Sequence, residues 1–150
     1  MKLFLKAGVM AALMGFAATS CDSYKDNETP DKFVEANKDL SGVWSLTKVM
    51  RNNVDITSTM DFSKFRLRLN PDGSYSLENR LPFPVRHSGL WSVDDPAHPF
   101  MLSFTEDGAI GAMEVGIQYP IVNGMRQLSI THSPGCGSNK YEYLFVKANN

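Results

Sequence analysis

The stretch FRLRLNPDGSYSLE, residues 65–78, decides the fold class because it specifies a β-hairpin. Residues 70–73, Asn-Pro-Asp-Gly, have the chemistry of a turn: proline presets its own φ, and glycine accepts the positive φ that closes a three-residue loop. Hydrophobic and polar residues alternate on both sides of this turn, as expected for strands with one buried face. One register satisfies both faces, with the expected pairs Arg66–Glu78, Leu67–Leu77, Leu69–Tyr75 and Asn70–Ser74.

A second hairpin is predicted around Asn123-Gly124, the strongest two-residue signal for a type I′ turn. The turn joins residues 113–122 to residues 126–132, and both segments alternate. Again one register separates an apolar face from a polar face. The expected pairs are Val115–His132, Ile117–Ile130 and Tyr119–Leu128 on the apolar face, and Gly116–Thr131 and Gln118–Ser129 on the polar face.

Short strands follow one another along the rest of the chain, and no helical pattern of 10–15 residues interrupts them. The segments 79–88 and 94–99 are rich in proline and turn residues, so we expect loops there. The expected strands are residues 42–49, 65–69, 74–78, 89–93, 100–104, 113–122, 126–132 and 141–147. This spacing predicts an all-β fold, an antiparallel up-and-down barrel of about eight strands. Closure removes exposed edges and makes neighbours of the first and last strands, around Trp44 and Tyr143.

The first residues have the pattern of a bacterial lipoprotein signal. Lys2 and Lys6 precede an apolar run that ends at Thr19-Ser20-Cys21, and the run is too short to span a bilayer comfortably. The sequence thus predicts a signal peptide (residues 1–20), a lipidated tether with a short helix (21–39) and a barrel domain (40–150). The short helix is expected over residues 29–36, because Thr29 is a suitable cap and Pro30 fits the first turn. Acyl chains on Cys21 would hold the protein at a membrane.

Charge and cysteine content limit the partners. Removal of the two signal-peptide lysines leaves 13 basic and 16 acidic side chains, a net charge of −3. No basic patch points to nucleic acid. If Cys21 is lipidated, Cys136 has no partner within the chain, so the exported domain has to fold without a disulfide. We expect a monomer.

The chain resembles the lipocalin-like lipoproteins of Bacteroidota, a group of calycin-type barrels of unknown function. Gly42-Val43-Trp44 matches the Gly-X-Trp opening of lipocalins, and the Asp-Gly hairpin and Gly89-Leu90-Trp91 follow in the same order. Lipocalins carry an arginine in the last strand that packs over this tryptophan, whereas this chain offers Lys140 and Lys147 there.

The resemblance also implies a location. It places the protein at the outer membrane, anchored through Cys21. Asp22, Asp26 and Glu28 resemble the acidic signal for surface export in that group, but they also suit an ordinary solvated tether. The periplasmic side and the cell surface both remain open.

No catalytic or metal-binding pattern is present in the sequence. His87, His98 and His132 are far apart, and their spacing matches no metal site. The chain contains no nucleophile elbow, phosphate loop or dinucleotide fingerprint. We therefore expect no catalytic residue, no bound metal and no cofactor, and a protein that is not an enzyme.

Two functions suit such a barrel. The expected inward side chains are bulky, which favours a filled interior, although eight strands can also enclose one small ligand. These side chains are Trp44, Phe65, Leu67, Tyr75, Trp91, Phe100, Phe104, Tyr119 and Tyr143. The first hypothesis is a module that binds a small apolar or amphipathic ligand at the open end, through Trp91, Tyr143 and His132. The alternative is a solid barrel whose loops bind a partner protein or glycan through Phe83 and His98.

Overall fold

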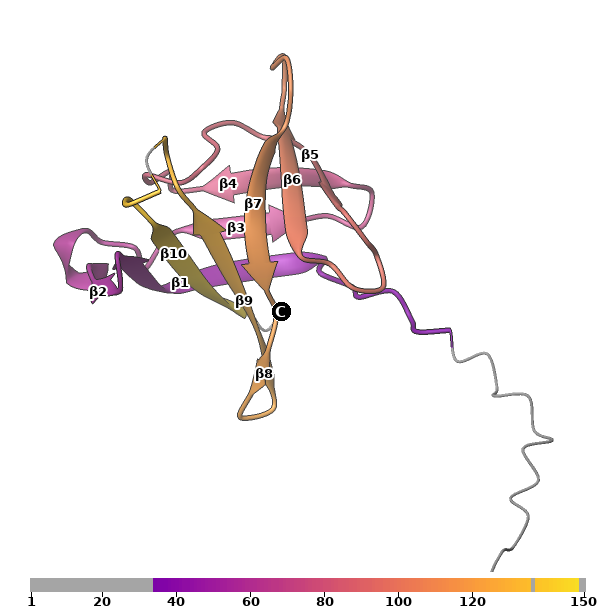
Figure 1. The fold of residues 1–150 in the computed structure, drawn as a ribbon, viewed down its shortest axis with the longest axis horizontal. Coiled ribbons are helices and arrows are strands. Elements are labelled where there is room, and N and C mark those ends of the chain that lie inside the picture. The colour runs from indigo at the N-terminus through magenta and orange to yellow at the C-terminus, as the bar shows by residue number, and fades with distance from the viewer. Residues whose placement is uncertain (1–33, 136, 149–150) are drawn as a thin grey trace, which may run out of the picture. The chain divides into compact units, whose positions relative to one another are not determined.

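Eight strands close into an antiparallel barrel, as the sequence predicts (Figure 1). The computed structural model describes residues 34–135 and 137–148. The strands of the barrel are β1 (Gly42–Arg51), β3 (Arg66–Leu69), β4 (Ser74–Glu78), β5 (Gly89–Val93), β6 (Met101–Glu106), β7 (Met113–Gln118), β9 (Met125–His132) and β10 (Tyr141–Lys147). They pair in chain order, and the β1–β10 pairing closes the barrel.

Two short strands extend the barrel at its ends. β2 (Val54–Asp55) pairs with β1, and β8 (Ile121–Val122) pairs with the start of β9. The sequence predicted one strand over residues 113–122, but this segment divides into β7 and β8 at Tyr119-Pro120. Proline has no N–H for the ladder, so it interrupts the strand. The β8 hairpin therefore projects beyond the barrel wall (Figure 1).

Both predicted hairpins have the predicted turns. Asn70 pairs with Ser74 across the first turn, where Gly73 has a φ of 83°. The β3–β4 register is Arg66↔Glu78, Leu67↔Leu77 and Leu69↔Tyr75. In the second hairpin the turn residues Asn123 and Gly124 have φ values of 51° and 76°. Its β7–β9 pairs are Gly116↔Thr131, Ile117↔Ile130 and Gln118↔Ser129, so local turn chemistry did fix both registers.

One expected ion pair is replaced by a diagonal one. Arg66 lies opposite Glu78, but Glu78 forms its salt bridge with Arg68, at 3.3 Å from Nη2 to Oε1. The guanidinium of Arg66 instead donates to the backbone carbonyls of Ser63 and Phe65. Diagonal neighbours in a strand pair are within reach of long side chains, so register alone does not choose the partner.

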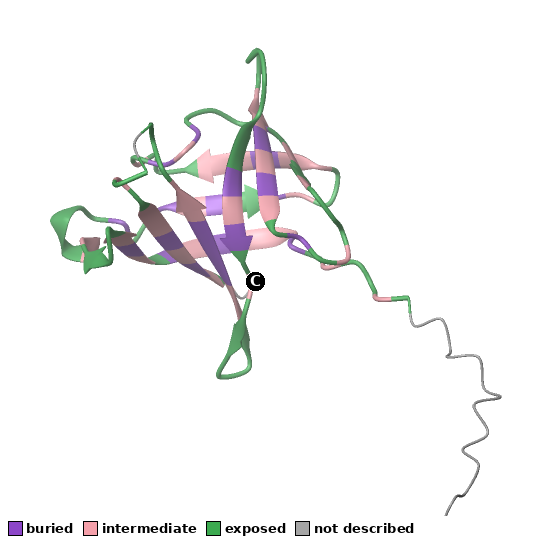
Figure 2. Ribbon diagram, in the orientation of Figure 1, coloured by how far each residue is buried: buried purple, intermediate pink, exposed green. Residues whose placement is uncertain are grey.

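The interior of the barrel holds the apolar faces of the strands. Buried and half-buried residues alternate along the strands, while most loop residues are exposed (Figure 2). Trp44 is fully buried, and its Nε1–H donates to the carbonyl of Leu40 at 2.9 Å. The prediction for Phe100 was wrong, because this side chain is 69% exposed. It precedes β6 and lies beyond Val93↔Leu102, the last pair of the β5–β6 ladder.

Several expectations concern residues at the start of the chain. The signal peptide, the lipidation site Cys21 and most of the expected helix at 29–36 lie outside the described residues, as does Cys136. Residues 34–36 are described and take no helical conformation. In the described residues, the one helical element is the 3₁₀ turn η1 (Thr57–Thr59). That part of the chain also contains no helix with the length and apolar character needed to cross a bilayer.

Candidate functional site

Four connections meet at one end of the barrel. The β1–β3, β4–β5, β6–β7 and β9–β10 connections lie together because alternate connections of an antiparallel up-and-down barrel fall at the same end. This end, formed by residues 52–65, 79–88, 107–112 and 133–140, is termed the pocket end. The opposite end carries residues 70–73, the loop 94–100 and the β8 hairpin.

The loop 79–88 is fixed at both of its ends. At its start, Asn79 adopts a φ of 51°, and its side-chain amide donates to the carbonyl of Lys64 at 2.9 Å. At its finish, the Glu106 carboxylate accepts the backbone N–H groups of Arg86 and His87. These two amide bonds lower the pKa of Glu106, and the His87 ring, 3.5 Å away, lowers it further. The loop is thus held to strand β6 by a charged acceptor.

Phe83 fills the barrel mouth from the middle of this loop. Its side chain is 8% exposed, and its ring centroid lies 5.2 Å from Tyr143 and 5.3 Å from Phe65. The rings of Phe104 and Phe145 are each 6.1 Å away. The sequence assigned Phe83 to a surface for partner proteins, but the structure places it inside. The reason is that the flanking prolines direct one apolar side chain inward at a point where the strands leave space.

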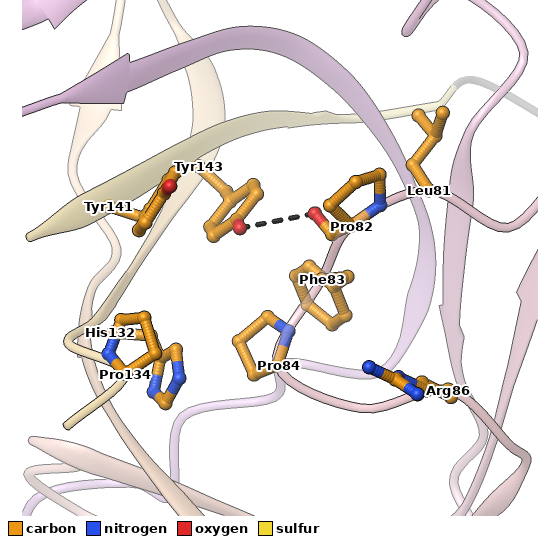
Figure 3. Close-up of a pocket in the computed structure, with 9 residues that line it drawn as sticks. All are labelled: Leu81, Pro82, Phe83, Pro84, Arg86, His132, Pro134, Tyr141 and Tyr143. Carbon is orange, nitrogen blue, oxygen red and sulfur yellow. Dashed lines mark hydrogen bonds between the residues drawn. The ribbon is translucent and has the colours of Figure 1, made fainter.

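A pocket of about 360 Å³ opens beside Phe83 (Figure 3). It is termed the tyrosine pocket and is lined by Leu81, Pro82, Phe83, Pro84, Arg86, His132, Pro134, Tyr141 and Tyr143. The hydroxyl of Tyr143 donates to the carbonyl of Pro82 at 3.1 Å, so this ring supports the loop. Burial, and to a lesser extent Tyr141, raises the pKa of Tyr143 to about 12, so the hydroxyl remains a donor at neutral pH.

A second pocket, of about 540 Å³, lies on the same loop. It is termed the arginine pocket and is lined by Met60, Arg80, Leu81, Pro82, Arg86 and His87. The two pockets share Leu81, Pro82 and Arg86. Both volumes lie in the range of sites that hold small molecules.

The structure brings together two of the three residues predicted to bind a ligand. Tyr143 and His132 both line the tyrosine pocket, because β9 ends where β10 begins. Trp91 is half-buried near the opposite end, where its Nε1–H donates to the carbonyl of Asn70 at 3.0 Å. Its position follows from the register, since β5 pairs with β4 only at its first two residues and then continues past the Asn70 turn.

His98 also lies at the opposite end, far from the pockets. Its Nε2 is 2.6 Å from the Glu35 carboxylate, and its Nδ1 is 3.8 Å from Asp95. The backbone N–H of Lys38 donates to the carbonyl of Pro96 nearby. His98 thus ties the segment before β1 to the loop 94–100, and its role in binding a partner stays a prediction.

A comparison with known families identifies the domain. The model of a domain of unknown function, DUF5004, matches residues 22–146. The chain belongs to the DUF5004 family. The match covers all eight barrel strands except the last residue of β10. No curated protein and no solved structure matches the chain.

The sequence analysis missed the residues that border both pockets of this DUF5004 domain. Residues 80–86 read RLPFPVR, in which two prolines flank Phe83 and an arginine stands at each end. This pattern could have indicated an ordered loop with one inward side chain, because prolines stiffen a loop and arginines keep its ends at the surface. Within residues 34–135 and 137–148, no group of three or more metal-ligating side chains comes together.

Proposed function

We propose that this DUF5004 domain binds a small amphipathic molecule at the pocket end of its barrel and performs no chemistry on it. The observation that carries the proposal is the pair of pockets that share Leu81, Pro82 and Arg86. The interior beneath them is occupied by Phe83, so the ligand lies on the loop rather than deep in the barrel.

The chemistry of the pocket walls supports an amphipathic ligand. Proline rings, leucine and the Tyr141 ring offer apolar contact, while Arg86 and His132 offer polar contact at the rim. Tyr141 stacks on Tyr143, with ring centroids 6.3 Å apart and an angle of 17° between the rings. Flat apolar walls with a few polar groups at the rim are typical of small-molecule sites.

Binding of the neutral dye N-phenyl-1-naphthylamine tests this proposal. The purified protein should enhance the fluorescence of the dye, and Tyr141→Ser should weaken binding about fivefold to tenfold, because a ring-sized apolar contact is lost. Tyr119→Ser is the matched control, since Tyr119 is a half-buried tyrosine outside both pockets. No binding by the unaltered protein, or an equal loss in both variants, would contradict the proposal.

A relation to lipocalin-like lipoproteins is part of the proposal, and one contact supports it. Lys147 pairs with Trp44 across β10 and β1, and its Nζ lies 5.9 Å from the centroid of the Trp44 ring. A cation over this tryptophan is the arrangement that an arginine makes in lipocalins, so Lys147 fills that role here. Together with the signal pattern that ends at Cys21, this relation leads us to propose a non-enzymatic, lipid-anchored protein of the outer membrane, facing the periplasm or the cell surface.

Replacement of Cys21 tests the anchor. Cys21→Ser should move the protein from the membrane fraction to the soluble fraction, because without acyl chains nothing proposed here holds it to lipid. Fractionation followed by detection of the protein gives the result. Cys136→Ser is the control and should leave the protein with the membranes. Retention of Cys21→Ser in the membrane fraction would show that another feature anchors the chain.

A second candidate function is binding of a partner protein or glycan through the loops. The β8 hairpin favours it, because Ile121, Val122 and Met125 are 63%, 40% and 55% exposed on a segment that projects from the barrel. Exposed apolar side chains grouped on one projection are typical of contact sites. This candidate replaces the first if the dye does not bind at the pocket end.

A further inference from the structure

The arginine pocket combines positive charge with an apolar floor. Three of its six lining residues are basic, namely Arg80, Arg86 and His87, and none of the six is acidic. The chain as a whole has a net charge of −1. Positive charge gathered around a concave surface is therefore a local feature that the composition of the chain does not explain.

The two arginines of this pocket are not used within the part of the chain that the structure describes. Neither guanidinium forms an ion pair or a side-chain hydrogen bond there, whereas Arg68 pairs with Glu78, and Arg51 donates to Asn139. The carboxylate of Glu106, at the end of β6, accepts the backbone N–H groups of Arg86 and His87 and contacts the His87 ring, and it forms no ion pair with either guanidinium. An incoming anion thus has no internal partner to displace.

The position of Arg86 links the two pockets. Its side chain lines both of them, and Figure 3 shows it at the edge of the tyrosine pocket, apart from the tyrosine rings. A ligand whose apolar part lies on Leu81 and Pro82 would have its polar end within reach of Arg86 on one side and Arg80 on the other. Guanidinium groups present forked donors that match carboxylate, sulfate and phosphate oxygens.

We propose that the molecule bound at the pocket end is an anionic amphiphile, whose charged group is held by Arg80 and Arg86 and whose apolar part lies on Leu81 and Pro82. This inference rests on the proposed binding function and adds the charge of the ligand. The free arginines and the absence of acidic residues from the lining carry it.

A pair of probes that differ only in charge tests the inference. The probes are 11-(dansylamino)undecanoate and its uncharged amide, and binding is followed by dansyl fluorescence. The protein should bind the carboxylate about a hundredfold more tightly than the amide, a factor of about ten for the charge-assisted contact with each of the two arginines. Arg86→Gln and Arg80→Gln should each weaken binding of the carboxylate about tenfold and leave the amide unchanged. Arg126→Gln, outside both pockets, is the matched control and should change neither.

The outcomes separate this inference from the function on which it rests. If neither probe binds, the proposed binding function is wrong. If both bind equally and the arginine variants change nothing, the pocket binds amphiphiles but the inferred charge is overturned. If Arg126→Gln weakens binding of the carboxylate probe as much as Arg86→Gln does, general charge attraction explains the preference for the charged probe. The assignment of the anion site to Arg80 and Arg86 would then be overturned.

Discussion

Replacement of Phe83 by alanine should lower the free energy of unfolding by about 3–5 kcal/mol, the usual cost of removing a buried phenylalanine ring. The ring contacts four other aromatic rings, with centroid distances of 5.2 to 6.1 Å, and it is the point at which the loop 79–88 joins the core. Alanine would leave a cavity lined by the rings of Phe65, Phe104, Tyr143 and Phe145. The last three belong to strands, and Phe65 directly precedes β3, so these rings cannot move inward freely.

Denaturant unfolding measures this loss. Trp44 and Trp91 provide the fluorescence signal. The denaturant concentration at the midpoint of unfolding should fall, while the dependence of the unfolding free energy on denaturant stays nearly constant. Phe100→Ala is the matched control, since the Phe100 ring is 69% exposed and its removal should change the unfolding free energy by less than about 0.5 kcal/mol. Equal effects of the two variants would show that Phe83 does not fill the barrel.

Gly89→Ala should destabilise the domain by about 3 kcal/mol or more, because the added methyl group overlaps backbone. A Cβ at Gly89 would lie 1.9 Å from the carbonyl oxygen of Thr105 and 2.9 Å from the Cα of Glu106. Gly89 pairs with Glu106 on one side and with Tyr75 on the other, so neither neighbour can retreat without breaking a ladder. The cost here comes from close approach of two strands rather than from an unusual φ.

Gly116→Ala is the control for this second variant. Gly116 also lies in a strand of the barrel, but its nearest contact for a Cβ is the Thr131 side chain at 4.0 Å, an ordinary separation. The control should change the unfolding free energy by less than about 0.5 kcal/mol. Comparison of the two thermal or denaturant midpoints gives the result. A mild effect at Gly89, similar to that at Gly116, would mean that β5 and β6 can move apart.

The parts of this fold that follow from short-range chemistry were predictable from the sequence. Asn70-Pro71-Asp72-Gly73 and Asn123-Gly124 fix their turns, and each turn fixes the register of its strands. Closure through the first and last strands followed from the need to cover both edges. The inward position of His132 near a strand end was also predicted, and the register of β9 and β10 pairs it with Tyr141, two residues from Tyr143.

The residues that the sequence analysis misplaced lie in a loop, beside a strand end or in the staggered strand β5. Nothing in the alternation of residues 79–88 indicates that Phe83 enters the barrel, since a loop has no period to read. Trp91 was expected beside Tyr143, but strand stagger places it near the other end. Phe100 continues the alternation of β6 beyond the point where neighbouring strands cover it.

The shortest seam of the barrel gives the loop 79–88 a protective role. β5 pairs only with Ser74 and Tyr75 of β4. In the part of the chain that the structure describes, residues 76–78 of β4 therefore have no strand on the side that faces β5. Free backbone groups of this kind attract strands from other molecules. The loop 79–88 leads from β4 to β5 at this seam, and its residues Phe83 and Val85 are buried. We therefore expect the same loop that forms both pockets to hinder aggregation through this edge.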